Sequence, residues 1–321
     1  MTVDYHVHLE EGPYSFRWLE RTSRALQHFY PIQEGVHQRD WIRSSHNALR
    51  ERLEKGPYSP EWLDLYLQKA KERNLSEVGI VDHLYRFNET RDYFENHMDI
   101  SETDLGRKQH RWLKQVMTEN MDDFVGFIES QKAKWADHGI QLKLGMEADF
   151  FPGSHDRLKE LLSGHNWDYV IGSVHFVDGW GFDNPEAIDQ FERYDLEELY
   201  GRFFQIVEEA IRSGLFDFVA HLDNLKVFNF RPKEDKLLHS YQKIARALVE
   251  TNTATEVNAG LFYRYPIKEM CPSPSFLKVL AEAGVRFTTS SDSHFPDDIG
   301  LYVSENTEVI KKLGIHQVAT F

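Results

Sequence analysis

The sequence predicts an α/β fold in which parallel strands are joined by crossover helices. Short apolar runs rich in β-branched residues alternate along the chain with segments of helical period, and this alternation is typical of such a fold. With 321 residues, of which 41% are hydrophobic and 13% aromatic, the chain can bury a large core. The length suits one large barrel or two ordinary domains, and no shift in composition indicates two.

Seven runs are predicted to be strands. Each consists mainly of apolar, β-branched or aromatic residues and is bounded by polar or turn-forming residues. In chain order they are Val3–His8, Glu77–His83, Leu142–Glu147, Tyr169–His175, Phe216–His221, Ala254–Asn258 and Arg286–Asp292.

Helical segments are predicted between these strands. Ser59-Pro60 has the form of a helix cap followed by proline at the first helical position, and Gly214 and Gly284 stand where helices are expected to stop. The predicted helices are Pro60–Arg73, Met121–His138, Ala187–Ser213, Lys236–Thr251 and Ser273–Ala283. The order is therefore β/α throughout.

Two long stretches exceed what a minimal barrel needs. Residues 15–56 contain Trp18, Trp41 and many arginines, whereas residues 86–120 are polar with interleaved aromatic residues. Long connections in a compact domain are more often functional lids than idle loops. Both stretches are therefore expected at the rim of the barrel.

Composition limits the classes of function. A formal charge of −15 and a pI near 5.5 argue against a protein that binds nucleic acid or an anionic membrane, because both need a basic field. An anionic substrate must then be captured by local positive charge. Cys271 is the single cysteine, so an internal disulfide framework is excluded, and neither a signal peptide nor a membrane-spanning run is expected. A cytoplasmic location is the expectation.

The first predicted strand contains half of a metal site. Alternate side chains of an extended strand share a face, so His6 and His8 project in the same direction, about 7 Å apart. Two imidazoles arranged in this way can bind one ion together and need further ligands.

Metal-type side chains recur at the ends of other predicted strands. Active sites of parallel β/α barrels lie at the carboxyl ends of the strands, which converge there. A single histidine near an apolar run is more often a packing residue, but the shared position of this set favours a metal centre. The set consists of His6, His8, His83, Glu147, His175, His221, Asp292 and His294.

The number of donors indicates more than one ion. Seven or more nitrogen and oxygen donors exceed what one site with open positions takes from protein, and no thiolate is among them. Glu147 ends an otherwise apolar strand, where a buried carboxylate needs a cation, and it can bridge two ions about 3.5–4 Å apart. Imidazole and carboxylate suit zinc, iron or manganese.

Taken in order, these motifs resemble the PHP (polymerase and histidinol phosphatase) superfamily. Gly172-Ser-Val-His-Phe followed by Gly181-Phe-Asp183-Asn, and then Glu256-Val-Asn258-Ala-Gly-Leu, look like its histidinol-phosphate phosphatase branch. The resemblance runs from about residue 3 to about residue 300. Its other motifs are Asp4-x-His6-x-His8, Val81-Asp82-His83, Gly145-x-Glu147-Ala-Asp149, Ala220-His221-Leu-Asp223 and Ser290-Ser-Asp292-Ser-His294.

This resemblance implies one PHP barrel domain over residues 1–321, folded as a distorted (β/α)7 TIM-like barrel with a trinuclear metal centre. By the family's motifs, the first ion has the ligands His6, His8, Glu147 and Asp292, and the second has Glu147, His175 and His221. The third ion has His83, His294 and one ligand from the loop after strand one.

In that loop the sequence departs from the family pattern. Many relatives have a histidine or an aspartate there, whereas this chain reads His8-Leu-Glu10-Glu11-Gly-Pro-Tyr14. Glu11 is the first choice for the missing ligand, followed by Glu10 and Tyr14, and the alternative is that both glutamates are ordinary solvated residues. Two or three divalent ions are therefore expected.

The chemistry implied is hydrolysis of a phosphomonoester. Coordination lowers the pKa of water from 15.7 to about 7, so that a metal-bridging hydroxide can attack phosphorus. Glu147, Asp292 and His294 are the predicted catalytic residues. Arg264, just after strand six, stands where the family has a phosphate-binding arginine. Arg86 and Arg231 are weaker candidates.

Three aspartates next to the proposed ligands have two alternative roles. Asp82, Asp149 and Asp223 either accept a hydrogen bond from a ligand imidazole or cap the loop that follows.

The leading functional hypothesis is a histidinol-phosphate phosphatase of histidine biosynthesis, with a small phosphorylated substrate and no nucleic-acid or membrane partner. One alternative retains the barrel and changes the substrate to another small phosphomonoester or a nucleotide. A second is a metal-binding barrel without catalytic activity. A third, hydrolysis of a C–N bond by an amidohydrolase-like barrel, would require a lysine where Glu147 stands.

Overall fold

The computed structural model describes every residue except Met1, Glu11 and Glu34. Seven parallel strands form its main sheet in the spatial order β1-β2-β3-β4-β7-β8-β9. Their bounds are Val3–His8 (β1), Glu77–Val81 (β2), Gln141–Asp149 (β3), Tyr169–Ser173 (β4), Phe218–Val219 (β7), Ala254–Asn258 (β8) and Phe287–Ser290 (β9). All seven predicted strands are present, and β1 and β8 have the predicted bounds.

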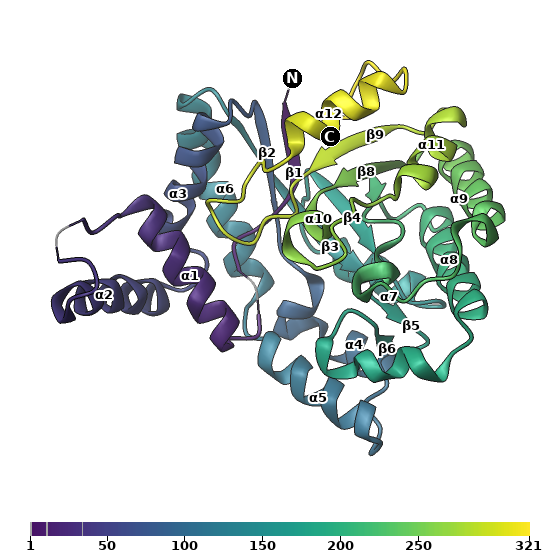
Figure 1. The fold of residues 1–321 in the computed structure, drawn as a ribbon, viewed down its shortest axis with the longest axis horizontal. Helices are drawn as coiled ribbons and strands as arrows, with labels where there is room; N and C mark the ends of the chain where they lie inside the picture. Colours follow the sequence, from purple (N-terminus) through teal and green to yellow (C-terminus); the bar gives the residue numbers. More distant parts are fainter. Residues whose placement is uncertain (1, 11, 34) are drawn as a thin grey trace.

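The sheet curls into a nearly closed barrel (Figure 1). Its first and last strands meet through an isolated parallel bridge between Val7 and Ser293, where His8 N donates a hydrogen bond to Ser293 O at 2.7 Å. The α/β barrel predicted from the sequence is therefore confirmed. Phe176–Val177 (β5) and Trp180–Gly181 (β6) add a short antiparallel hairpin directly after β4.

Helices surround the barrel (Figure 1). Apart from the helices of the two insertions, they are Pro60–Glu72 (α3), Met121–Asp137 (α6), His155–Leu162 (α7), Leu196–Arg212 (α8), Leu238–Thr251 (α9), Gly260–Arg264 (α10), Pro274–Glu282 (α11) and Val303–Lys312 (α12). Gly214 and Gly284 follow helix ends with φ of 69° and 81°, so the predicted stops are correct. Within the described residues, no helix is both long enough and apolar enough to cross a bilayer.

One predicted helix, Ala187–Ser213, is wrong as a single element. A 3-10 helix, Pro185–Arg193 (η3), is followed by the extended residue Tyr194, and α8 begins at Leu196. Asp195 causes the new start, because its Oδ1 accepts hydrogen bonds from Glu197 N and Glu198 N at 2.9 and 3.0 Å. An N-cap of this kind satisfies backbone donors that a continuous helix would have used internally.

The two long insertions are largely helical. Residues 15–56 form Phe16–Phe29 (α1) and Arg39–Lys55 (α2), which extend to one side of the barrel in Figure 1. Residues 86–120 contain Arg91–His97 (α4) and Asp104–Val116 (α5).

Aromatic rings fill the part of the barrel below the strand ends. Tyr5, Tyr169 and Phe218 come from β1, β4 and β7 and pack in one buried cluster. Gly79 and Gly145 leave the room for the Tyr169 ring, since a Cβ at either position would collide with it. The barrel is thus closed by apolar packing below, and its polar side chains lie above.

A register shift in β1 allows consecutive residues to face the interior. The pairing of β1 with β2 is irregular between Asp4 and Val7. As a result Tyr5 belongs to the interior aromatic cluster while the next residue, His6, contacts carboxylates inside the barrel. Bulges of this kind redirect side chains next to functional sites.

Candidate metal centre

Eight of the nine proposed metal ligands meet at the carboxyl ends of the strands. His6 and His8 come from β1 and Glu147 from β3, while the other five lie just beyond β2, β4, β7 and β9. The ninth, Glu11, lies outside the described residues. Four groups have donor atoms within 4.8 Å of one another: His6, His8 and Asp292; His6, Glu147 and His221; His83, Glu147 and His175; and His8, His83 and His294.

Glu147 stands at the centre of this cluster. Its carboxylate is 1% exposed and contacts imidazoles from four strands and the loops after them. Oε2 lies 3.1 Å from His6 Nε2, 3.2 Å from His8 Nε2 and 2.8 Å from His83 Nδ1, and Oε1 lies 3.1 Å from His221 Nε2 and 3.7 Å from His175 Nε2. Asp292 Oδ1 lies 4.0 Å from Nε2 of both His6 and His8.

Several of these converging atoms make no hydrogen bond of acceptable geometry. Among the described residues they include His6 Nε2, both ring nitrogens of His8, His83 Nδ1 and Glu147 Oε2, all buried. Polar atoms buried without partners are costly, and a cation bound between them removes that cost. The donor set is entirely imidazole and carboxylate, so it fits zinc, iron or manganese.

Three members of the cluster already have the protonation state that metal binding needs. Burial would raise the pKa of Glu147, but His83 and His6 hold it well below its usual range. Burial and the neighbouring His83 lower the pKa of His8, and burial together with Arg264 lowers the pKa of His294. Near neutral pH, Glu147 is therefore a carboxylate and both histidines are uncharged, the forms in which these side chains bind metals.

Two buried carboxylates orient the ligand imidazoles. His175 Nδ1 donates to Asp149 Oδ1 at 2.7 Å. Burial alone would lower the pKa of His175, but the Asp149 carboxylate raises this pKa to about 10. His6 Nδ1 lies 3.2 Å from both oxygens of Glu256, which also accepts from His221 N at 3.1 Å. Such partners fix the ring that coordinates. The sequence analysis placed Glu256 in a family motif and predicted no role for it, although a carboxylate inside a buried strand itself indicates a functional residue.

The other two aspartates hold loops. Asp82 accepts from His83 N at 2.8 Å and from Arg86 Nε at 3.2 Å. Asp223 accepts from Ser273 N at 2.8 Å and from Lys226 Nζ at 2.9 Å. Asp82 and Asp223 therefore fit the role of holding a loop, whereas Asp149 fits the role of orienting a candidate ligand imidazole.

In the loop after β1, Glu10 and Tyr14 contact each other, and Glu10 also contacts the first insertion. Glu10 is 2% exposed and accepts a hydrogen bond from Trp18 Nε1 and one from Arg52 Nη2 at 2.8 Å. Tyr14 donates to Glu10 Oε2 at 3.5 Å. This carboxylate joins β1 to α1 and α2, and neither residue belongs to the four metal groups found among described residues.

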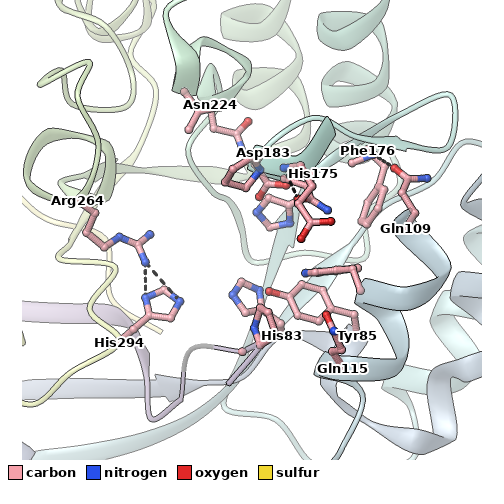
Figure 2. Close-up of a pocket in the computed structure, with 18 of the residues that line it drawn as sticks. His83, Tyr85, Gln109, Gln115, His175, Phe176, Asp183, Asn224, Arg264 and His294 are labelled. Carbon is pink, nitrogen blue, oxygen red and sulfur yellow. Dashed lines mark hydrogen bonds between the residues drawn. The ribbon is translucent and has the colours of Figure 1, made fainter. Parts of the chain in front are cut away.

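Arg264 lies at the metal cluster, at the end of α10. Its Nη1 is 2.5 Å from His294 Nδ1 (Figure 2). Its Nη2 is 3.1 Å from Asp292 Oδ2. The weaker candidates form ion pairs instead: buried Arg86 with Asp82 and Glu119, and Arg231 with Glu269. Of the three arginines considered, Arg264 is the one that combines proximity to the ligands with a place in the cavity wall.

Two of the candidate ligands have unusual backbone conformations. His221 has a φ of 26° and Asp292 a φ of 53°, a region that residues other than glycine rarely occupy. Strain of this kind concentrates at functional sites, where the surrounding structure enforces it.

The cluster opens into a cavity of about 370 Å³. Both insertions contribute to its wall, through Arg17 and Trp18 on one side and Trp112 and Gln115 on another. Asp183 also lines the cavity and points into it beside His175 (Figure 2). Sequence reasoning quoted Asp183 in a motif and gave it no role.

Comparison with known proteins agrees with this geometry. The PHP domain family matches residues 59–260. A probable histidinol-phosphatase of Deinococcus radiodurans is 33% identical over 234 residues, covering 70% of this chain and 87% of that protein. A histidinol-phosphatase of Lactococcus lactis is 27% identical over 218 residues, covering 63% and 76%.

A solved structure has the same fold. It is the histidinol phosphate phosphatase of Lactococcus lactis complexed with zinc, L-histidinol and phosphate, which aligns with a TM-score of 0.65 at 18% identity, covering 100% of this chain and 96% of that one. The family match spans well over half of the chain, and the Deinococcus relative is covered almost completely. The chain belongs to the PHP family.

Proposed function

We propose that this protein is a metal-dependent phosphomonoesterase that hydrolyses L-histidinol phosphate to L-histidinol and phosphate. The observation that carries the proposal is the convergence of six histidines, Glu147 and Asp292 at one mouth of the barrel, with Arg264 beside them. Imidazoles and carboxylates around one cavity, together with a guanidinium, suit the binding and hydrolysis of a phosphate ester.

The residues of the chain have distinct roles in this proposal. Divalent ions held by the cluster would supply a water of lowered pKa and positive charge at the phosphoryl oxygens. Glu147 joins the ligand groups, while Asp149 and Glu256 hold the rings of His175 and His6 in place. Arg264 faces the same space, and a planar guanidinium can bind two phosphoryl oxygens.

The choice of substrate is supported by the relatives. The proteins from Deinococcus and Lactococcus have the names of histidinol-phosphatases, and the Lactococcus structure contains L-histidinol and phosphate. Hydrolysis of histidinol phosphate places the protein in histidine biosynthesis. A small substrate also suits the cavity volume of about 370 Å³.

Two or three ions of zinc, iron or manganese form part of the proposal. Four ligand groups that share Glu147, His6, His8 and His83 imply sites close enough to have common ligands. With Glu10 bonded to Arg52, the group of His8, His83 and His294 contains no carboxylate among the described residues. The acidic charge and single cysteine support a cytoplasmic enzyme that does not bind nucleic acid.

A phosphate-release assay on purified protein tests the proposal. We expect hydrolysis of L-histidinol phosphate that a chelator abolishes and that manganese, zinc or iron restores. The same metal-loaded sample should be assayed with nucleoside monophosphates and sugar phosphates. Turnover of one of those esters that is faster by orders of magnitude would reject the substrate and retain the phosphatase chemistry. No release from any ester at full metal content would favour the non-catalytic barrel.

A further inference from the structure

The cavity contains one carboxylate that the metal centre does not use. Asp183 is half-buried and lines the cavity, yet it belongs to none of the four metal groups found among the described residues. The described residues also include no side chain that forms an ion pair or hydrogen bond with its carboxylate. The charge of Asp183 is offset by the neighbouring His175 and His83 rather than by a directly bonded group, and such a carboxylate in a partly enclosed space favours a cation as its ligand.

The backbone holds Asp183 firmly in this position. The residue follows the β5–β6 hairpin, where Phe182 N donates to His175 O at 3.2 Å and the Phe182 ring is fully buried. Gln109 of α5 fastens the same hairpin, since its Oε1 accepts from Gly181 N at 2.7 Å and its Nε2 donates to Gly179 O at 2.9 Å. These hydrogen bonds to His175 O and to the Gln109 amide fix the backbone next to Asp183, so its carboxylate is preorganised to bind.

Two basic side chains of the cavity wall already have acidic partners. Arg111 Nη2 lies 2.6 Å from Glu186 Oε2, and Lys108 Nζ lies 2.9 Å from Asp104 Oδ2. The wall near Asp183 also contains the rings of Tyr85 and Trp112, whose centroids are 4.9 Å apart. An acidic residue beside an aromatic wall suits an organic cation that also carries a flat ring.

We infer that Asp183 binds a cationic nitrogen of the substrate, the ammonium group of L-histidinol phosphate, while Arg264 and the metal cluster hold the phosphoryl end. The inference rests on the proposed function and explains how the site distinguishes this ester from other phosphomonoesters. A charge-assisted hydrogen bond is strong, and a site built to make one discriminates against analogues that lack the group.

Two substrates separate this role from a structural one. We expect Asp183→Asn to lower kcat/KM for L-histidinol phosphate by about 10- to 100-fold, the loss of one bond to a charged group, and to change kcat/KM for p-nitrophenyl phosphate less than about twofold. Bound metal per chain should be unchanged. Asp122→Asn is the control, because Asp122 is 90% exposed on α6 outside the cavity wall, and this change should leave both values unchanged.

Product binding gives a readout that does not depend on turnover of the natural ester. L-Histidinol should inhibit hydrolysis of p-nitrophenyl phosphate, with an inhibition constant that rises about 10- to 100-fold in Asp183→Asn. An unchanged constant, an equal loss with both esters, or a loss of metal would each overturn the inference. Failure of the proposed function is a separate result, namely that the unmodified protein does not hydrolyse L-histidinol phosphate.

Discussion

At the scale of single residues, Glu147 contacts more of the proposed ligands than any other side chain in the cluster. We expect Glu147→Gln to reduce phosphatase activity more than about 100-fold and to lower metal content, because losing even a residue behind a ligand typically costs 10- to 100-fold. An amide keeps one acceptor oxygen and no charge, whereas both oxygens of Glu147 face imidazoles. Elemental analysis and phosphate release on the same sample measure the effect.

Glu129→Gln is the matched control for this change. Glu129 is exposed on α6, pairs with Lys132 and does not belong to the candidate metal groups. Activity and metal content should therefore stay at the level of the unmodified protein. Normal phosphatase rates in Glu147→Gln would reject the bridging role assigned to it.

The residues at strand ends were predictable, and their partners were not. His83, Glu147 and His221 stand out because each ends an apolar run, a local pattern that periodicity detects. Glu256 pairs with His6 across 250 positions, and Arg52 reaches Glu10 across 42. No local pattern encodes such a contact, since it exists only after the barrel closes and the insertion packs against it.

At the scale of elements, α1 brings a second arginine to the cavity. Arg17 lines the cavity, and its guanidinium carbon lies 5.9 Å from the centre of the Tyr265 ring, while that of Arg264 lies 5.7 Å from the same ring. We expect Arg17→Ala to raise the inhibition constant for inorganic phosphate by about 3- to 10-fold, because one exposed hydrogen bond between the guanidinium and phosphate would be lost. Added salt should reduce this effect.

Arg24→Ala provides the comparison on the same helix. Arg24 is 72% exposed and pairs with Glu20, so the inhibition constant for phosphate should not change. If the two variants behave alike, α1 forms a wall of the cavity without contributing charge to phosphate binding.

The attachment of the first insertion depends on a buried ion pair. Arg52 of α2 is 4% exposed, pairs with Glu10 at 2.8 Å and stacks over the Trp62 ring. Breaking a buried pair leaves an uncompensated charge, so Arg52→Ala should lower the free energy of unfolding by roughly 3 kcal/mol. Arg50→Ala removes an exposed arginine 3.7 Å from Glu54 and should cost less than about 1 kcal/mol. Urea unfolding of metal-loaded protein compares them, and equal midpoints would contradict the anchoring role.

The predicted helix boundaries were accurate where capping residues were recognised and inaccurate where a capping residue was overlooked. Pro60 and Gly284 mark the start of α3 and the end of α11 closely. The break before α8 also had a local signal, Asp195-Leu-Glu-Glu198, which is a helix-start pattern inside a stretch read as continuous. The helices of the insertions were not predicted, although the buried side chains of α1 and α5 fall on one face of each helix, so a local signal was present there as well.

At the scale of the whole molecule, the candidate metal centre lies at the seam where the two ends of the sheet meet. β1 and β9 are the two ends of the sheet, and within the described residues their main chains share the isolated bridge between Val7 and Ser293. Each end also supplies candidate ligands, His6 and His8 from β1 and Asp292 and His294 just after β9. Ions bound between these side chains would therefore join the ends of the sheet as well as serve the chemistry.

This arrangement predicts where metal removal acts on stability. Chelation should lower the melting temperature, because a ligand held 100- to 1,000-fold above its Kd stabilises the folded state by about 3–4 kcal/mol. Amide hydrogen exchange in a peptide covering residues 5–10, whose His8 N–H bonds to Ser293, should accelerate more than exchange in residues 254–258 at the β8–β9 pairing. We expect this difference because a small cooperative unit at the seam can open and exchange its amide hydrogens before the whole barrel unfolds. Equal acceleration in both peptides would mean that metal stabilises the fold uniformly, and unchanged exchange at the seam would contradict a joining role for the ions.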